Sequence, residues 1–179
     1  MAIRLRTASV DDAQLLATLG ARLFEQTFGS ANSPEDMASY LADAFSESRQ
    51  STELAEPSWR TWIAEDDSGT AVGYAVLIRG STIENLRGQQ ATEIRRIYVD
   101  ASLHGRSVTP DGRRAGQVLI ERCVDQAREW STSAIWLAVW EENAKAIRFY
   151  EKHGFQQVGV KTFQLGSDIQ HDYVMARNL

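Results

Sequence analysis

The sequence predicts a mixed α/β fold in which a sheet of about seven strands is flanked by helices. The patterns along the chain follow the order strand, helices, three strands, helix, strand, helix and two strands. A near-continuous apolar run, AIWLAVW at 134–140, is typical of a strand that is covered on both faces. A helical pattern at 114–130 separates this run from the strand EIRRIYV at 93–99, which predicts a right-handed crossover between two parallel neighbours.

The first third of the chain predicts one strand and then helices. IRLRTA at 3–8 alternates apolar and polar residues, as a half-buried strand does. Ser9 is a candidate N-cap for the next helix, and Asp12 has the position of the capping-box acid. Apolar residues then recur at helical spacing, namely Leu15, Leu16, Leu19, Leu23 and Phe24. Ser33, followed by proline and two acids, starts a second helix that runs towards residue 45, and STELAE at 51–56 predicts a further short helix.

The middle of the chain predicts a hairpin, a strand and an amphipathic helix. WRTWIAE at 59–65 and TAVGYAVLIR at 70–79 are joined by the turn DDSG and are expected to pair. The polar segment at 81–91 predicts a loop before the strand TEIRRIYV. One face of the following helix carries Ala115, Val118, Leu119, Cys123, Ala127 and Trp130.

After the apolar strand, the chain predicts one more helix and two more strands. Asn143 is the expected N-cap of NAKAIRFYEKHGF, and Gly154 is the expected residue that ends this helix. QQVGVKTF at 156–163 and HDYVMARN at 171–178 are the last two predicted strands. Without repeats or linkers, we expect one domain over residues 1–179.

Composition limits the classes of function. A net charge of −5 and a pI near 5.2 argue against nucleic-acid binding. No run of eighteen apolar residues and no signal-peptide pattern are present, so we expect a cytoplasmic protein that does not interact with membranes. The single Cys123 agrees with a reducing compartment, and its spacing from the three histidines predicts no metal site.

The stretch LHGRSVTPDGRRAGQVLIERC, at 103–123, combines glycines and arginines with a helix start at the end of a predicted strand. Glycines let a backbone approach a phosphate closely, and arginines and free helix amides neutralise it. Phosphate binding and an ordinary solvated loop are both compatible with these residues.

A second motif lies at 143–155, where the sequence follows the pattern N-x-x-A-x-x-F-Y-x-x-x-G-F. Asn143, Ile147 and Tyr150 share one face of the predicted helix. Phe149 and Phe155 are interpreted as core residues. For Tyr150, both a core position and a role as proton donor remain open.

Together, these segments resemble the GNAT superfamily of acyl-CoA-dependent N-acetyltransferases over essentially the whole chain. FEQTFGSANSPEDMASYLADAF, EIRRIYV, IWLAVWEENAKAIRFYEKHGF and DYVMARNL are further similar to bacterial spermidine/spermine N-acetyltransferases. The resemblance implies a mostly antiparallel sheet whose parallel pair splays apart to hold acetyl-CoA, the acetyl donor. It also implies a small amine as acceptor, with polyamines favoured, and allows a homodimer.

The resemblance assigns cofactor contacts to several segments. The arm of acetyl-CoA is expected along Ile97, Tyr98 and Val99, its pyrophosphate at His104, Gly105, Arg106, Arg114, Ala115, Gly116 and Gln117, and further contacts at Asn143, Ala146 and Tyr150. Relative to the family, Ser107 to Arg113 are seven extra residues with a Pro-Asp-Gly turn at their centre. This insertion either folds outward or displaces the phosphate loop, and Arg113 is the first residue expected to contribute if it takes part.

The reaction needs a proton acceptor and a proton donor. Glu93 is the candidate base, although a surface role is also open, and Arg95 stands where related sequences often carry a second acid. The Val99 amide is the candidate oxyanion donor and Tyr150 the candidate general acid.

The acceptor site is less well defined by the sequence. Phe24, Phe28 and Tyr40 are expected either to wall this site or to belong to the core. Two alternatives to polyamine acetylation remain: a GNAT-fold protein that binds acetyl-CoA as a regulator, and an acetyltransferase that acts on protein amino groups.

Overall fold

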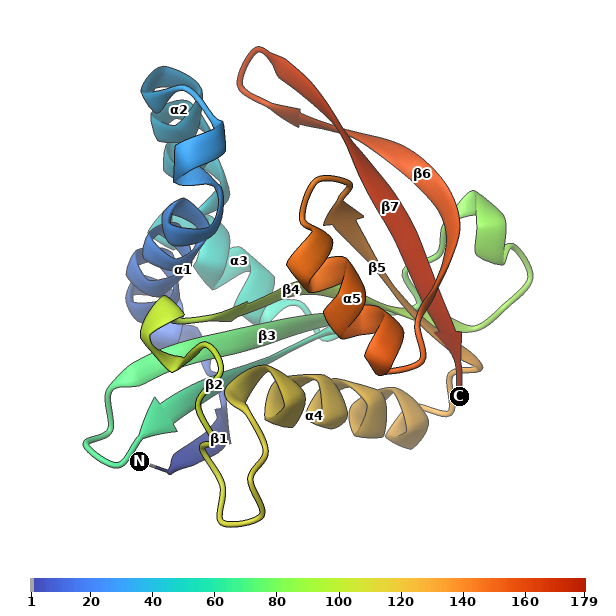
Figure 1. Cartoon of the computed structure of the whole chain (residues 1–179), viewed down its shortest axis with the longest axis horizontal. Coiled ribbons are helices and arrows are strands. Elements are labelled where there is room, and N and C mark those ends of the chain that lie inside the picture. Colours follow the sequence, from blue (N-terminus) through green and yellow to red (C-terminus); the bar gives the residue numbers. More distant parts are fainter. Residues whose placement is uncertain (1) are drawn as a thin grey trace.

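The computed structural model describes residues 2–179, and its centre is a single seven-stranded sheet (Figure 1). In spatial order the strands are β1 (Ile3–Thr7), β2 (Trp59–Asp66), β3 (Ala71–Arg79), β4 (Ala91–Val99), β5 (Ala134–Trp140), β7 (Asp168–Asn178) and β6 (Gln156–Leu165). All neighbouring strands are antiparallel except β4 and β5, which are parallel. The predicted sheet of seven strands with one parallel pair is therefore confirmed.

Five α-helices lie on the two faces of the sheet. They are α1 (Ala13–Phe28), α2 (Pro34–Ala44), α3 (Glu47–Ala55), α4 (Ala115–Glu129) and α5 (Ala144–Lys152). Helices α4 and α5 contribute to the larger core cluster, together with inward residues of β2 to β5. Helix α1 contributes to a second cluster, which includes β2 and β3 residues and against which Tyr98 of β4 packs. In Figure 1, α4 lies below the sheet and α1 to α3 stand together at the left.

The helix boundaries follow from the capping residues that the sequence predicts. The Ser33 side chain accepts a hydrogen bond from the Asp36 amide at 3.1 Å, and Asn143 Oδ1 accepts one from the Ala146 amide at 3.1 Å. Gly154 has a φ of +83°, a conformation that glycine adopts without strain, directly after α5. These local signals place α2 and α5 where the sequence predicts them.

The parallel strands β4 and β5 pair over only part of their length. Their register ends at Ile94 opposite Leu137, and beyond this point the two strands diverge (Figure 1). The pairing of β4 with β3 shifts register between Ile94 and Arg96, so Arg95 is the extra residue of a bulge. A bulge of this kind bends its strand, which agrees with the divergence of β4 from β5.

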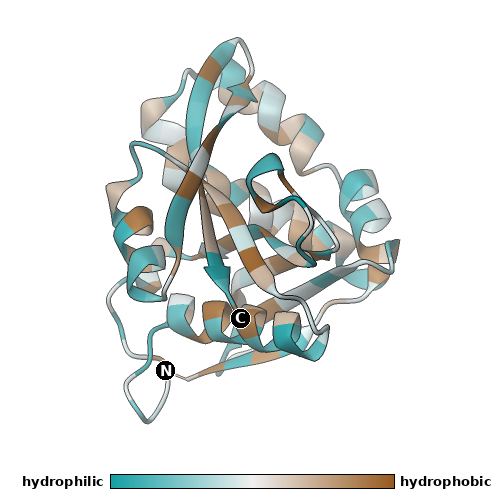
Figure 2. Ribbon diagram, turned by 90° about the vertical axis from the view of Figure 1, so that its right-hand side faces the viewer, coloured by the Kyte–Doolittle hydropathy of each residue, from teal (hydrophilic) through white to brown (hydrophobic). Residues whose placement is uncertain are grey.

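Two features of the fold differ from the sequence prediction. Leu15 was expected on the apolar face of α1, but its relative exposure is 38 %, because the packed stripe consists of Leu16, Leu19 and Leu23. The last hairpin is also longer than predicted, since β6 continues to Leu165 and β7 begins at Asp168. In Figure 2, hydrophilic and hydrophobic residues alternate along this hairpin, which is at the top of the view. Among residues 2–179, no helix is long and apolar enough to cross a membrane.

Candidate active site

The divergence of β4 from β5 leaves one edge of β4 without a strand partner. The Asp100 amide donates to the Val72 carbonyl of the neighbouring chain segment at 2.8 Å. Because successive amides of a strand point to opposite edges, the Val99 and Ile97 amides point away from β3, towards the side that β5 has left. The backbone at 97–99, where the arm of acetyl-CoA is expected, therefore offers hydrogen-bond donors at this edge. The ring of His104 lies here too, with Nε2 at 3.2 Å from the Val99 carbonyl oxygen.

The seven extra residues of the loop after β4 fold outward. Ser107 and Arg114 form an antiparallel bridge that closes the insertion at its base. Val108 is only 1 % exposed and belongs to the larger core cluster, and its carbonyl accepts a hydrogen bond from the Ile3 amide at 3.1 Å. Arg113 points to Glu121 of α4, with Nη1 at 3.0 Å from Oε2. The insertion is thus attached to β1 and α4, and the expectation that Arg113 contributes to a phosphate site has no support in these contacts.

The bridge brings the two halves of the predicted phosphate loop together. Arg106 and Arg114 have exposed side chains, and within residues 2–179 neither forms an ion pair, although ten other arginines do. Gly105 has a φ of +79°. Ala115, Gly116 and Gln117 form the first turn of α4, where backbone amides have no intrahelical acceptor. Two cations without partners beside free helix amides match the chemistry of a phosphate site.

Helix α5 places the predicted cofactor residues on the side of the diverging strands. Asn143 uses its Oδ1 as the helix cap, which leaves its side-chain NH2 group as a donor. Ala146 is half-buried against the larger core cluster. Tyr150 is 8 % exposed, and within residues 2–179 no hydrogen bond reaches its hydroxyl. Burial raises the pKa of Tyr150 well above its usual range, so the phenol stays protonated at neutral pH.

Glu93 lies on the opposite face of the sheet from α4, and its carboxylate has two partners. Ser81 donates a hydrogen bond to Oε2 at 2.6 Å, and Arg95 Nη1 lies 3.4 Å from Oε1. The side chain is buried, with 7 % relative exposure. The surface role left open for Glu93 is therefore wrong, and its burial next to the β4 bulge keeps it as a candidate for proton transfer.

The three predicted wall residues fall into two groups. Phe24 is 4 % exposed and belongs to a core cluster, whereas Phe28 and Tyr40 are half-buried. The ring of Phe28 contacts Tyr98 of β4 and Trp140 of β5, with centroids 6.5 Å and 6.2 Å away. The Tyr40 ring lies 5.6 Å from that of Phe163 on β6. Trp140 and Phe163 thus belong to the same aromatic wall, which a search restricted to the first two helices does not find.

The tip of the β6–β7 hairpin lies beside α2 (Figure 1). The Asp36 carboxylate accepts a hydrogen bond from the Ser167 amide at 2.7 Å, and Gln170 Nε2 donates to Asn32 Oδ1 at 2.7 Å. Donors from Ser167 and Ser33 keep the pKa of Asp36 below its usual value. These contacts tie the hairpin to α2 and to Asn32 just before that helix.

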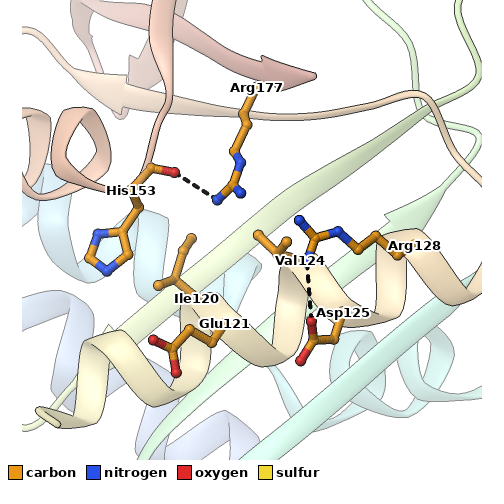
Figure 3. Close-up of a pocket in the computed structure, with 7 residues that line it drawn as sticks. All are labelled: Ile120, Glu121, Val124, Asp125, Arg128, His153 and Arg177. Atoms are coloured by element: carbon orange, nitrogen blue, oxygen red, sulfur yellow. Dashed lines mark hydrogen bonds and ion pairs between the residues drawn. The ribbon is translucent and has the colours of Figure 1, made fainter. Parts of the chain in front are cut away.

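A cavity of about 290 Å³ lies elsewhere, between α4 and the residues His153 and Arg177. Its lining comes from α4, from His153 after α5 and from Arg177 of β7 (Figure 3). Arg177 donates to the His153 carbonyl at 2.8 Å, and Arg128 pairs with Asp125, so the charged groups largely satisfy one another. None of the predicted site residues lines this cavity. Among residues 2–179, no cluster of side chains could hold a metal ion.

Comparison with known proteins agrees with this arrangement. A family model described as "Acetyltransferase (GNAT) family" matches residues 21–155. An uncharacterised N-acetyltransferase of Mycobacterium bovis is 34 % identical over 168 residues, which is 94 % of this chain and 98 % of the relative. An uncharacterised N-acetyltransferase of Lactobacillus delbrueckii subsp. lactis is 31 % identical over 177 residues, 99 % of this chain and 98 % of that protein. Among solved structures, the PaiA N-acetyltransferase of Thermoplasma acidophilum in complex with coenzyme A superimposes with a TM-score of 0.76 over 100 % of both chains, at 19 % identity.

Proposed function

The chain belongs to the acetyltransferase (GNAT) family and is an acetyl-CoA-dependent N-acetyltransferase, and on that premise we propose that its acceptor is a primary amine of a polyamine. The observation that carries the proposal is the contrast between the two sides of the diverging strands. Unpaired arginines and helix amides lie at the end of β4, and half-buried aromatic rings with acidic groups lie on the face under α1 and α2.

The residues at the end of β4 suit the donor. Acetyl-CoA supplies an acetyl group that is activated as a thioester. We assign its pyrophosphate to Arg106, Arg114 and the first amides of α4, and its arm to the free edge of β4 at Ile97 and Val99. The NH2 group of Asn143 completes this set of donors. His104, held by the Val99 carbonyl and by Lys145, lies beside this set as the remaining predicted contact.

The proposed chemistry assigns each proton to a residue of the chain. An alkylammonium has a pKa of about 10.4, so the acceptor must lose a proton before it attacks. Glu93 takes this proton, directly or through a water molecule. The Val99 amide donates to the oxygen that gains negative charge during attack. As the C–S bond breaks, the Tyr150 hydroxyl, which burial keeps protonated, gives its proton to the leaving thiolate, and the second proton of the attached nitrogen restores the phenol directly or through water.

A small flexible amine fits the acceptor side better than a protein surface does. The β6–β7 hairpin donates hydrogen bonds to Asp36 of α2 and to Asn32 just before it, and we infer that this tie restricts access and disfavours a broad polypeptide acceptor. Aromatic faces and acids attract ammonium groups, and the chain carries a net charge of −5. The similarity of four segments to spermidine/spermine N-acetyltransferases points to the same class of acceptor.

The test is a thiol-release assay over a panel of acceptors, accompanied by an acetyl-CoA binding isotherm. The panel contains spermidine, spermine, a diamine, a peptide with a free N-terminus and a peptide with an internal lysine. We expect kcat/KM for spermidine to exceed that for either peptide by about tenfold or more, the effect of about 1.4 kcal/mol. A preference for the peptides would refute the polyamine assignment. Tight binding of acetyl-CoA without turnover of any amine would refute acetyl transfer and favour the regulatory alternative.

A further inference from the structure

A buried carboxylate outside the predicted site, that of Asp172, lies on the acceptor face. Asp172 of β7 is directly opposite Trp140 of β5 and Lys161 of β6 in the strand register. Residues that face each other across neighbouring strands point to the same side of the sheet. Trp140 contacts Phe28 of α1, so this is the side covered by the first two helices.

Asp172 has no partner, although it is buried. Its relative exposure is 9 %, and within residues 2–179 its carboxylate forms neither a hydrogen bond nor an ion pair. Lys161 stands opposite, but its ammonium lies over the Trp136 ring, 5.9 Å from the centroid, instead of pairing with Asp172. In the described part of the chain, the fully buried polar side-chain atoms without a partner are those of Tyr74 and Arg113, so the Asp172 oxygens keep some contact with solvent and are accessible to a donor. Such a group persists at a binding site when a ligand supplies the missing donor.

The surroundings of Asp172 define the chemistry of that ligand. Phe163 lies two residues after Lys161 on the same face of β6. Its ring is 5.6 Å from that of Tyr40, so Tyr40 belongs to the same side of the sheet as Asp172. Burial raises the pKa of Asp172 itself. The attraction of Lys161 opposes this shift and repulsion from Glu141 adds to it. A carboxylate beside aromatic rings is suited to an alkylammonium, which combines a donor charge with apolar methylenes.

We propose that Asp172, with the rings of Phe28, Tyr40, Tyr98 and Trp140, binds an ammonium group of the acceptor. The inference rests on the proposed function, because it identifies which side chains recognise the amine. It differs from the role given to Glu93, whose carboxylate is already engaged by Ser81 and Arg95. Asp172 is accordingly a binding residue, and its loss weakens the affinity for the acceptor rather than the affinity for acetyl-CoA.

The decisive experiment is calorimetric titration of spermidine into the full chain in the presence of coenzyme A. Asp172→Asn keeps the shape of the side chain and removes its charge. We expect its dissociation constant for spermidine to rise about ten- to hundredfold, the usual effect of losing a charge-assisted contact. The matched control is Glu141→Gln, which removes the same charge from a more exposed position near Asp172. This control should stay within about twofold of the unmodified protein if the contact is specific rather than a general field effect.

A second measurement separates binding from folding. Removing an unpartnered buried charge should leave the melting temperature of Asp172→Asn unchanged or raise it, whereas loss of a structural contact would lower it. Lys161→Met provides an independent variant, since without the competing cation spermidine should bind more tightly. Unchanged spermidine affinity in Asp172→Asn, or an equal loss in Glu141→Gln, would overturn the subsite.

The outcomes for the subsite and for acetyl transfer are distinguishable. If the protein acetylates peptides but does not bind spermidine, the subsite is refuted and amine acetylation stands. If spermidine binds in an Asp172-dependent manner but no amine is turned over, acetyl transfer is refuted and the subsite stands.

Discussion

Removing the insertion Ser107 to Arg113 should cost stability and leave the donor site intact. Val108 is 1 % exposed, and complete burial of a valine side chain contributes about 1.5–3 kcal/mol. The hydrogen bond from the Ile3 amide to the Val108 carbonyl adds about 0.5–1.5 kcal/mol. The pair between Arg113 and Glu121 is about 40 % exposed on both sides and adds about 0–1 kcal/mol. Because the shorter loop recovers about 0.6 kcal/mol of closure entropy, the net loss should be about 1.5–5 kcal/mol.

Urea denaturation followed by tryptophan fluorescence measures this loss as a change in the extrapolated free energy of unfolding. Val108→Ala should reproduce about half of it, and Pro110→Ala at the exposed tip should change stability by less than about 0.5 kcal/mol. Acetyl-CoA binding is measured under conditions in which the deletion variant is fully folded. The dissociation constant should change by less than about threefold, because no side chain of the insertion is directed to the phosphate loop. A deletion variant as stable as the unmodified protein, or one with acetyl-CoA affinity altered more than about tenfold, would refute this reasoning.

Three further predictions concern the site and its edges. Tyr150→Phe should lower kcat about 10²–10⁴-fold and leave acetyl-CoA affinity unchanged. Stopped-flow measurement of thiol release tests this, and an unchanged kcat would contradict the role of Tyr150 as proton donor. Glu93→Gln should lower kcat by about 10²-fold or more without lowering the melting temperature, and a normal rate would assign proton transfer to another group. Burial opposes ionisation of Asp100, but hydrogen bonds from Arg22 and Ser102 lower its pKa to about 2. The ionised carboxylate of Asp100 therefore contributes its full stabilisation above about pH 4, and this contribution is lost as the pH falls towards about 2. We expect Asp100→Asn to make the free energy of unfolding less dependent on pH in this acidic range. An unchanged pH dependence would show that other carboxyl groups dominate it.

Local signals predicted most of the fold because each one satisfies a backbone requirement within a few residues. Ser33 and Asn143 bind amides three positions ahead, so their helices begin where the sequence alone places them. The parallel pair of β4 and β5 was predictable from an apolar strand and a crossover helix. Leu15 was misassigned because helical spacing alone does not identify which of two adjacent leucines faces the sheet.

The acceptor side was harder to predict because its residues come from distant parts of the chain. Phe28 meets Trp140 only when α1 and β5 are assembled, and Tyr40 meets Phe163 only when α2 and β6 are. Asp172 did carry a signal, since it occupies the same strand face as the buried Val174 and Ala176, and an acid in an apolar stripe is unusual. That signal becomes interpretable only with the strand register, which shows that neither Lys161 nor any other cation pairs with it among residues 2–179.

The position of the insertion explains how an interrupted loop can still present its cations. The Ser107–Arg114 bridge holds the ends of the insertion side by side, so Arg106 and Arg114 become neighbours despite seven intervening residues. Arg113 is neutralised by Glu121, whereas Arg106 and Arg114 keep their charge for a ligand. Burial of Val108 then holds the base of the insertion against the core. The insertion is therefore a stabilising element that is attached to β1 and α4 next to the donor site. Substitutions in the insertion at positions other than Val108 should be tolerated.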